Sequence, residues 1–436
     1  MRMIVGLAML LVIGLLLGAS MLVYAAYVLA IAFWLCRYLA ERWMENLKAT
    51  RIMSATEVEI GQKVSIQINL QNRSKWPIPW LLVEDALPLS AFHRPPPALR
   101  RDGQSVRICW VPGRGSKLIS YSLTPQRRGY FQIGPLIAES GDLLGLHRRV
   151  KSVTEPARLL VVPKVIPLDG YNIASRRPVG EVKVSYRVQE DPTLMSGIRQ
   201  YQNGDPLRSI HWHATARTGQ LQSKQYQPTC VAGATLVLDF HKRTNPRKHD
   251  PVRSDLACTA AASICHTLML WQQQFGLISN GRDAADRVLQ DRSLREFADR
   301  NDAQHAVAMA AESDRIRPII LPTGRGPEHF AEAIKILARL ERTDGLHLPE
   351  LLIETQSRLP RDATVLVVVQ EVDEPAALAM GMLRRQGYSV AAIVNNYENE
   401  AFHAAVGRLL AQRIHVYHLF DEQSVPLICK EMILRF

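Results

Sequence analysis

The chain has 436 residues and a formal net charge of +12, from 53 lysines and arginines against 41 aspartates and glutamates. The basic residues are spread along the chain, and no aromatic-interleaved basic motif of the RNA- or DNA-binding kinds is present, so nucleic acid is not an expected partner. Attraction to anionic membrane lipid explains part of the charge more simply. The six cysteines are scattered without a C-x-x-C pair, which fits a reducing compartment.

The first segment is strongly apolar, since no charged residue occurs from Met3 to Cys36. As one helix it would run roughly 50 Å, well beyond a hydrocarbon core of about 30 Å. Small residues at positions 18–20 permit a reversal, and therefore predict a transmembrane hairpin within residues 1–50. Positive charge at Arg2 and from Arg37 onward places both ends, and the soluble body, on the cytoplasmic side of the inner membrane. The competing interpretation is a single tilted anchor or an uncleaved signal segment that exports the body.

Beyond the apolar segment, apolar and polar residues alternate, most clearly from Val64 to Leu70. Similar short runs recur at residues 107–110, 118–123 and 136–139, and Pro, Gly and Asn separate them. A period of two residues is typical of strands with one buried face. We therefore expect an antiparallel, β-sandwich-like domain over residues 51–165.

One proline-rich stretch interrupts this pattern, at Trp76-Pro77-Ile78-Pro79-Trp80. Proline cannot donate a hydrogen bond to a central ladder, so we expect a loop or a strand edge here. The two tryptophans leave three roles open, which are docking of a partner, packing in a core and contact with the membrane.

Residues 166–230 form a connector that is neither clean helix nor clean strand, and residues 231–436 return to a regular pattern. In the latter region we expect strands at 235–240, 275–279, 365–370, 388–394 and 414–419, and helices at 254–271, 328–342, 348–358, 375–386 and 401–411. Continuous apolar strands that alternate with helices indicate a largely parallel sheet covered on both faces. The expected fold class is therefore α/β plus all-β, with a doubly wound α/β domain at the carboxy terminus.

The connector contains a long and specific motif. Its members are Arg199, Tyr201, Gly204, Asp205, Arg208, Ile210, His211, Trp212, Ala216, Arg217, Gly219 and Leu221. The motif resembles the R-x-Y-x-x-G-D-x-x-R-x-I-x-W-x-x-x-A-R-x-G-x-L signature of the family filed as domain of unknown function fifty-eight (DUF58). Further landmarks of that family are similar at residues 128–135, 141–146 and 160–165, although Leu143-Leu144 departs from the usual Asp-Pro-Phe-Gly turn.

The resemblance implies a membrane-anchored protein with a β-rich domain and a carboxy-terminal domain similar to von Willebrand factor type A. It also implies a MoxR-type AAA+ ATPase as partner, and a chaperone-like duty in the assembly or remodelling of protein complexes, with a client that the resemblance does not name.

Two roles are open for the charged residues of the motif. In the structural one, Asp205 pairs with Arg208 or Arg217 and braces the domain junction. In the functional one, Arg199, Arg208 and Arg217 present guanidinium groups to an acidic partner surface or a phosphate. Gly204 and Asp205 fit a turn, and Trp212 is favoured as a core residue rather than a contact.

Metal binding is not expected at either candidate position. His211 and His213 would face the same way on a strand, but no third ligand of suitable spacing accompanies them. In domains similar to von Willebrand factor type A, Asp-x-Ser-x-Ser holds Mg²⁺ after the first strand, whereas this chain has Asp239-Phe-His-Lys-Arg243. Asp239 therefore marks a degenerate metal site, where the carboxylate pairs with Lys242 or Arg243 or caps a turn.

No motif of a known catalytic class is present, because the chain lacks the nucleophile elbow, the Walker A loop and the zinc-protease helix signature. We therefore expect a non-catalytic scaffold or adaptor without a cofactor, and its partners are the ATPase, the client protein and membrane lipid. Two rivals remain open. One is an exported protein that binds the cell envelope, and the other is a hydrolase or phosphate-handling enzyme that uses Asp239 and Asp205.

Overall fold

The structure is a computed structural model with mixed α/β architecture, one long apolar helix near the amino terminus and several sheets. It describes residues 2–18, 20–93, 95–142, 147–168, 190–202, 209–228, 233–288, 296–310, 317–360 and 363–428. The chain divides into two compact units. Unit 1 comprises Met1–Lys164, Arg282–Ile316 and Ile334–Arg342, and unit 2 comprises Val165–Gly281, Arg317–Ala333 and Thr343–Phe436.

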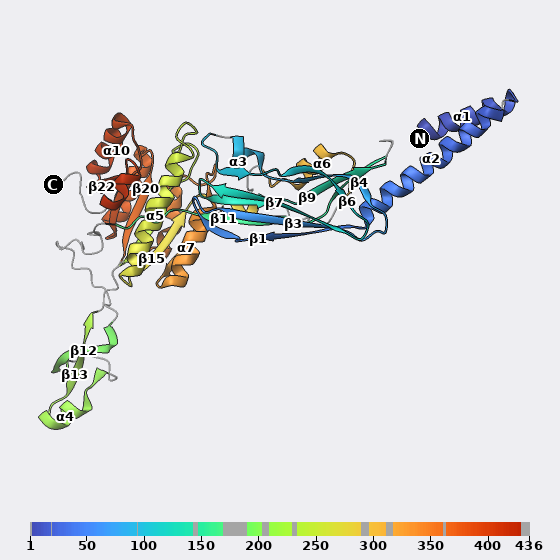
Figure 1. Cartoon of the computed structure of the whole chain (residues 1–436). Helices are drawn as coiled ribbons and strands as arrows, with labels where there is room; N and C mark the ends of the chain where they lie inside the picture. Colours follow the sequence, from blue (N-terminus) through green and yellow to red (C-terminus); the bar gives the residue numbers. More distant parts are fainter. Residues whose placement is uncertain are drawn as a thin grey trace. The chain divides into compact units, whose positions relative to one another are not determined.

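Unit 1 begins with two helices, α1 (Arg2–Leu16) and α2 (Ser20–Glu45), and Figure 1 shows α1 lying along α2. The chain reverses at Gly18, whose φ of +63° lies in the left-handed region that glycine adopts without strain. The break falls in the small-residue stretch, but α2 is longer than expected because it continues beyond Arg37. By length and composition α2 can cross a membrane, and only 11% of its most apolar window is buried.

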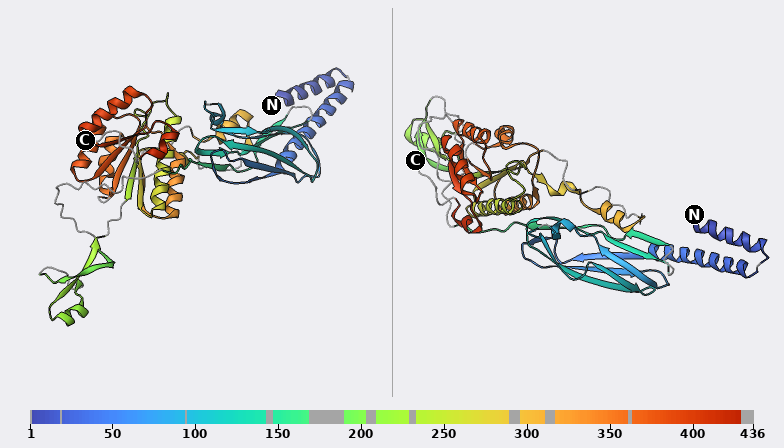
Figure 2. Two further views of the ribbon diagram at one scale, coloured as in Figure 1. Left: turned by 60° about the vertical axis from the view of Figure 1, so that its left-hand side comes forward. Right: turned by 90° about the horizontal axis from the view of Figure 1, so that it is seen from above.

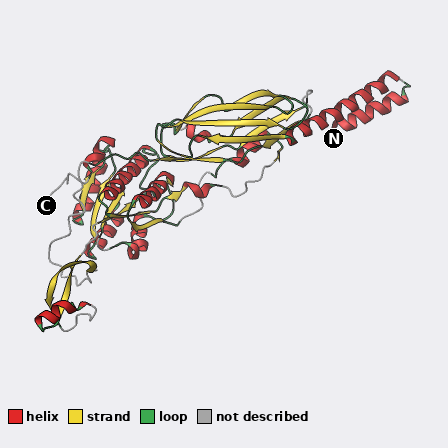
Figure 3. Cartoon of the chain, turned by 60° about the horizontal axis from the view of Figure 1, so that its bottom comes forward, coloured by secondary structure: helices red, strands yellow, loops and turns green. Residues whose placement is uncertain are grey.

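Strands make up most of the rest of unit 1, as Figure 3 shows in yellow. One sheet has the order β1 (Leu47–Met53), β3 (Val64–Asn72), β7 (Ser116–Pro125), β5 (Leu99–Asp102). The second has the order β17 (Glu296–Phe297), β10 (Arg148–Ser152), β9 (Leu136–Gly141), β4 (Ile78–Asp85), β6 (Val106–Val111). Smaller pairings join β2 (Glu57–Glu59), β11 (Ala157–Val162) and β8 (Gly129–Ile133), and β16 (Arg282–Asp283) with β19 (Leu340–Glu341). Short helices α3 (Leu89–His93), η2 (Ala284–Arg287) and α6 (Arg300–Val307) complete the unit.

The core of unit 1 follows from the alternation in the sequence. Along β3, Val64, Ile66, Ile68 and Leu70 are each at most 1% exposed, while the residues between them are more accessible. These side chains join residues of β4, β7, β9 and β11 in one buried cluster. One apolar face on each strand is thus sufficient to hold the sheets together.

The proline-rich stretch differs from the expectation. Pro79 and Trp80 belong to β4, which is an interior strand between β9 and β6. The pairing of β4 with β6 shifts register between Ile78 and Leu81, and the pairing with β9 starts only at Leu82. Pro79 is therefore tolerated because it lies at a bulge, where no regular ladder bond is required of it.

Unit 2 is built on a six-stranded sheet. Its order is β18 (Ile319–Gly324), β15 (Gln274–Ser279), β14 (Gly233–Leu238), β20 (Thr364–Val369), β21 (Ser389–Val394), β22 (His415–His418). The helices are α5 (Val252–Leu270), α7 (Pro327–Arg339), α8 (Leu348–Thr355), α9 (Glu374–Arg385) and α10 (Asn399–Ala411), with η3 (Gln356–Arg358) and η4 (Glu422–Leu427). All neighbouring strands are parallel except β18, which runs antiparallel to β15.

Helices cover both faces of this sheet (Figure 2). Val237, Val365 and Val367 pack in one cluster with residues of α8, α9 and α10, whereas α5 contacts β14 and β15. In chain order the strands run 3-2-1-4-5-6, so the direction of winding changes between β14 and β20. In open α/β sheets the crevice at the carboxyl ends of such a strand pair is the usual ligand position.

The residues of the family-like motif form a small element of their own. β12 (Glu190–Gln200) pairs antiparallel with β13 (Gln222–Pro228), and α4 (Trp212–Thr218) lies in the segment between the two strands. We refer to the described residues 197–202 and 209–228 as the signature hairpin.

Candidate functional site

Backbone pairing holds the base of the signature hairpin. Arg199 lies opposite Ser223, and the N–H of Tyr201 donates to the carbonyl of Leu221 at 2.9 Å. On the return side, the N–H of His211 donates to the carbonyl of Gln222 at 2.8 Å. Arg199 and Tyr201 therefore lie opposite Ser223 and Leu221, which follow α4 in the chain.

Helix α4 has a defined start and a defined end, although it is only one to two turns long. The Nδ1 atom of His211 accepts a hydrogen bond from the N–H of Ala214 at 3.0 Å, so His211 is the N-cap. At the other end Gly219 has a φ of +71°, and its N–H donates to the carbonyl of Thr215 at 2.9 Å. His211 and Gly219 of the motif thus have capping roles.

The sequence predicted neither a helix nor a strand around His211 and His213, and the structure makes Trp212–Thr218 a helix, so the strand geometry that would turn both histidines the same way does not apply. The ring centroids of His211 and His213 are 6.4 Å apart and the rings are nearly perpendicular. Within the described ranges no group of three His, Cys, Asp or Glu side chains is arranged to hold a metal ion. In the signature hairpin His211 therefore caps α4, and His213 is an exposed surface side chain.

Trp212 departs most clearly from the expectation, since 68% of its surface is exposed instead of lying in a core. None of the residues of α4 is buried. Arg217, five residues further along α4 and therefore about 140° around the helix axis, is also exposed, and its guanidinium has no hydrogen-bond or ion-pair partner among the residues that the structure describes. One short helix thus presents a large aromatic side chain and an unpaired cation on two different faces.

The cations Arg199, Arg217 and Lys224 lie in residues 197–202 and 209–228, which include no aspartate or glutamate, although β12 itself begins with Glu190 and Asp191. Gly204, Asp205 and Arg208 lie outside the described residues, so the ion pairs expected of Asp205 stay a prediction. The described part of the hairpin has the chemistry of a surface for an acidic partner.

Asp239 follows the carboxyl end of β14, next to the crevice between β14 and β20. It is 4% exposed, and its carboxylate accepts three hydrogen bonds. Oδ1 accepts from Asn280 Nδ2 at 2.7 Å and from the N–H of His241 at 3.1 Å, and Oδ2 accepts from the hydroxyl of Thr244 at 2.6 Å. The carboxylate therefore caps its own turn and ties it to the residue that follows β15.

Burial raises the pKa of the Asp239 carboxyl above its ordinary value, although the bonds from Thr244, Asn280 and the His241 N–H act in the opposite direction. The Lys242 ammonium lies 3.5 Å from the Asp344 carboxylate. Of the alternatives that the sequence left open for Asp239, the turn cap is the one that these hydrogen bonds support.

Sequence reasoning missed Thr244 and Asn280. A signal for Asn280 does exist, because it comes directly after an apolar strand parallel to the one that precedes Asp239. Polar residues after neighbouring parallel strands meet at one edge of the sheet. The side chain of Asn280 also accepts from the N–H of Phe240 at 2.7 Å, so it holds both ends of the Asp239 turn.

Comparisons with known proteins point to the same part of the chain. The family model described as "Protein of unknown function DUF58" matches residues 197–300, which include the described signature hairpin and Asp239. The "Uncharacterized protein YeaD" of Bacillus subtilis is 25% identical over 242 residues, which are 55% of this chain and 57% of that protein. The match thus spans little more than half the length of the curated relative.

Among solved structures, the CARDB domain of the PF1109 protein from Pyrococcus furiosus is 10% identical and matches 26% of this chain and 91% of that one, with a TM-score of 0.18. Proximal thread matrix protein 1 from the mussel byssus is 8% identical and matches 45% and 46%, with a TM-score of 0.26. The chain is therefore similar, through residues 197–300, to the DUF58 family, whose function is unknown.

Proposed function

We propose that this chain is a membrane-anchored, non-catalytic adaptor, which binds a MoxR-type AAA+ ATPase and directs it to the assembly or remodelling of other protein complexes. The observation that carries the proposal is that Trp212 is exposed and Arg217 is unpaired on the same short helix, α4. Tryptophan and arginine are among the residues most enriched at the energetic centres of protein interfaces.

The charge of the signature hairpin defines the partner surface. With three cations and no acid in its described part, the hairpin fits an acidic patch on the ATPase. The guanidinium of Arg217 is free to form a bidentate pair with a carboxylate, which is stronger and more directional than a contact from lysine. This chemistry gives specificity for a protein partner without a cofactor.

The anchoring part of the proposal uses α2. Its apolar stretch is long enough to cross a bilayer, and the short α1 lies along it as the second arm of the hairpin. Positive charge beyond Cys36 and at Arg2 then orients both ends, and the two soluble units, toward the cytoplasm at the inner membrane. The stretch from Met3 to Cys36 carries no charged residue, as a lipid environment requires.

Unit 2 supports the part of the proposal that concerns a domain similar to von Willebrand factor type A. Its order of 3-2-1-4-5-6, with helices on both faces, suits a doubly wound domain, and Asp239 stands where such domains hold their metal. The carboxylate is already occupied by three hydrogen bonds from this chain. A hydrolase that uses Asp239 would need that carboxylate to be free for substrate, so the observed contacts favour the adaptor.

The test is an affinity pull-down of the full-length protein from its own membranes, scored for a bound AAA+ ATPase. The informative variants are Trp212→Ala and Arg217→Ala. Ile353→Ala is the matched control, since Ile353 is 67% exposed against 68% for Trp212 but lies on α8. We expect each hairpin variant to lower ATPase recovery by about tenfold or more, as for residues at the centre of an interface.

Recovery should be unchanged for Ile353→Ala, and all three variants should keep their thermal unfolding profile. If no AAA+ ATPase is recovered with the wild-type protein, even after cross-linking, the adaptor proposal is wrong and the exported envelope-binding protein moves to the front. If the wild-type protein recovers the ATPase and Trp212→Ala and Arg217→Ala recover the same amount, the partner binds elsewhere on the chain.

A further inference from the structure

Two turns of unit 1 lie where α2 ends. The first, residues 72–77, connects β3 to β4, and the second, residues 112–115, connects β6 to β7. The N–H of Arg73 donates to the carbonyl of Asn46, the residue after α2, at 3.0 Å. We call these two turns the basal turns. If α2 crosses a membrane, the basal turns are on the side of the sandwich that faces the exit of this helix.

The basal turns are held rigidly against each other. Asn72 is 2% exposed, and its Nδ2 donates to the carbonyl of Trp76 at 2.9 Å and to that of Pro112 at 3.1 Å. The N–H of Arg114 donates to the carbonyl of Ser74 at 2.8 Å. A Cβ on Gly113 would lie 2.1 Å from the carbonyl oxygen of Lys75, so the two backbones approach as closely as only glycine allows.

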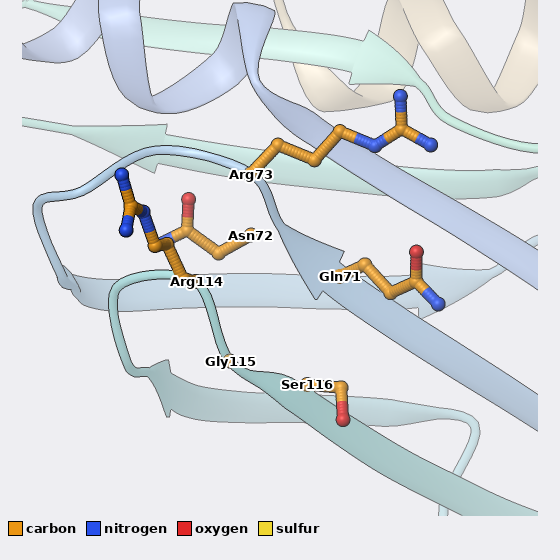
Figure 4. A pocket seen from close by; sticks show the side chains of 6 residues that line it. All are labelled: Gln71, Asn72, Arg73, Arg114, Gly115 and Ser116. Atoms are coloured by element: carbon orange, nitrogen blue, oxygen red, sulfur yellow. The ribbon is translucent and has the colours of Figure 1, made fainter.

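A hollow of about 490 Å³ lies at the basal turns. Its lining, drawn in Figure 4, consists of Gln71, Asn72, Arg73, Arg114, Gly115 and Ser116. Figure 4 shows the side chains of Arg73 and Arg114 extending from the two neighbouring turns, with their guanidinium groups pointing away from each other. The lining is polar throughout, which does not suit an apolar ligand and does suit a charged head group with hydroxyls.

The charge around the hollow is positive and uncompensated. Arg73, Lys75 and Arg114 are exposed, and none of their charged groups has a partner in the part of the chain that the structure describes. Residues 70–83 and 103–138 contain no aspartate or glutamate, and Glu45 at the end of α2 is paired with Arg42 at 3.6 Å. Three cationic side chains on two turns that are held against each other attract a surface that carries many phosphate groups.

Exposed aromatic residues flank the same turns. Trp76 is 67% exposed within the first basal turn, and Trp110, at the end of β6, is 57% exposed. Ile108, two residues earlier on the same face of β6, is 72% exposed. Tryptophan beside arginine and lysine is the combination that concentrates at the interface between a membrane and water.

We infer that the basal turns bind anionic phospholipid head groups, through Arg73 and Arg114, while Trp76 and Trp110 contact the interfacial region of the bilayer. The inference rests on the membrane anchoring proposed above, and it adds a lipid site that fixes the base of unit 1 on the membrane surface. A free phosphate ion shares the binding chemistry, but the flanking tryptophans and the adjoining α2 indicate that the ligand is a lipid.

Arg114 also provides the sharpest variant. Its φ of +54° is in the left-handed region, where an arginine is strained and a glycine is not. Arg114→Gly therefore removes the guanidinium and relieves the backbone at the same time, so a loss of lipid binding in this variant cannot be attributed to unfolding. Arg73→Gln is the second variant. Arg100→Gln with Arg107→Gln is the matched control, because these exposed arginines lie toward the opposite end of the same strands.

The experiment reconstitutes the full chain into nanodiscs of phosphatidylcholine alone, or of phosphatidylcholine with phosphatidylglycerol, and measures hydrogen exchange in residues 73–77 and 113–116. We expect phosphatidylglycerol to slow exchange there about fivefold for each arginine that contacts phosphate, and high salt to remove the effect. Arg114→Gly and Arg73→Gln should each lose most of the protection, and the control variant should keep it. Inorganic phosphate added to the phosphatidylcholine nanodiscs should give little protection.

The possible outcomes test the lipid site and the membrane anchoring as separate proposals. Incorporation into both kinds of nanodisc without any effect of phosphatidylglycerol on the basal turns would overturn the lipid site and leave the anchoring intact. Protection by inorganic phosphate equal to that by phosphatidylglycerol would overturn the lipid assignment in favour of a soluble anion. Failure to incorporate into either nanodisc would overturn both proposals.

Discussion

The Asp239 turn and the signature hairpin both lie in the region that matches DUF58, yet they differ in the burial and in the hydrogen bonding of their side chains. Asp239 is 4% exposed and receives three hydrogen bonds from its own chain. Trp212 is 68% exposed, and the charge of Arg217 has no partner among the described residues. Buried polar groups must be satisfied within the fold, whereas exposed ones are available to another molecule. The comparison therefore separates a structural site from a binding site.

The largest effect that would sharpen this comparison is on stability. Replacing Asp239 with Ala removes the acceptor of the His241 N–H, while the Asn280 Nδ2 and the Thr244 hydroxyl each keep one other acceptor, the carbonyls of Leu346 and His241. A buried donor without a partner costs about 1–3 kcal/mol, so we expect the free energy of unfolding to fall by about that amount. Thermal or denaturant unfolding of the full chain measures it. Unchanged stability with a lost biochemical activity would instead make Asp239 a catalytic residue.

The pH dependence gives a second prediction for the same side chain. Because burial raises the pKa of Asp239 in the folded state, its contribution to stability is fully present below the unfolded pKa of about 4 and is lost as pH rises through the folded pKa. The unfolding free energy of the wild type minus that of Asp239→Asn should therefore decrease above pH about 4. A difference that grows with rising pH would show that the hydrogen bonds outweigh burial.

Arg114→Gly should have a smaller effect of opposite sign. The left-handed conformation costs a non-glycine residue about 1 kcal/mol, so this variant should be more stable than the wild type by about that amount. Differential scanning of the full chain would measure the shift in melting temperature. A destabilised variant would mean that the Arg114 side chain makes a contact that holds the basal turns together.

Trp212→Ala should have the smallest effect on stability, within about 0.5 kcal/mol, since an exposed side chain contributes little to the fold. The same unfolding measurement applies, with Trp76→Ala as the control of equal exposure. A loss of stability comparable to that of Asp239→Ala would break the comparison, because it would show that Trp212 is covered by another part of the chain.

Much of unit 2 could be read from the sequence. Apolar runs such as 365–370 and 388–394 are long and uninterrupted, and β20 and β21 start within one residue of those positions. Parallel strands buried on both faces leave few alternative interpretations of such runs. The reversal between α1 and α2 was equally accessible, because small residues there coincide with the midpoint of the apolar segment.

Other features depended on contacts that a local pattern does not contain. β17 pairs with β10 through residues about 150 positions away, so the assignment of residues 282–316 to unit 1 has no local signal. Helix α4 is too short for a 3.6-residue period to be seen, which is why the sequence predicted neither a helix nor a strand there. Trp212 was favoured as a core residue because tryptophan is on average well buried, and only its place on a short isolated helix reverses this.

The most direct test of the central claim is site-specific photo-cross-linking in native membranes. A photoreactive residue replaces Ala216, which is exposed on α4 between Trp212 and Arg217, or Ile353, which is 67% exposed on α8. We predict that the label at position 216 captures an AAA+ ATPase and that the label at position 353 does not. Capture of the ATPase from position 353 alone, or of no ATPase from position 216, would contradict the signature hairpin as the partner surface.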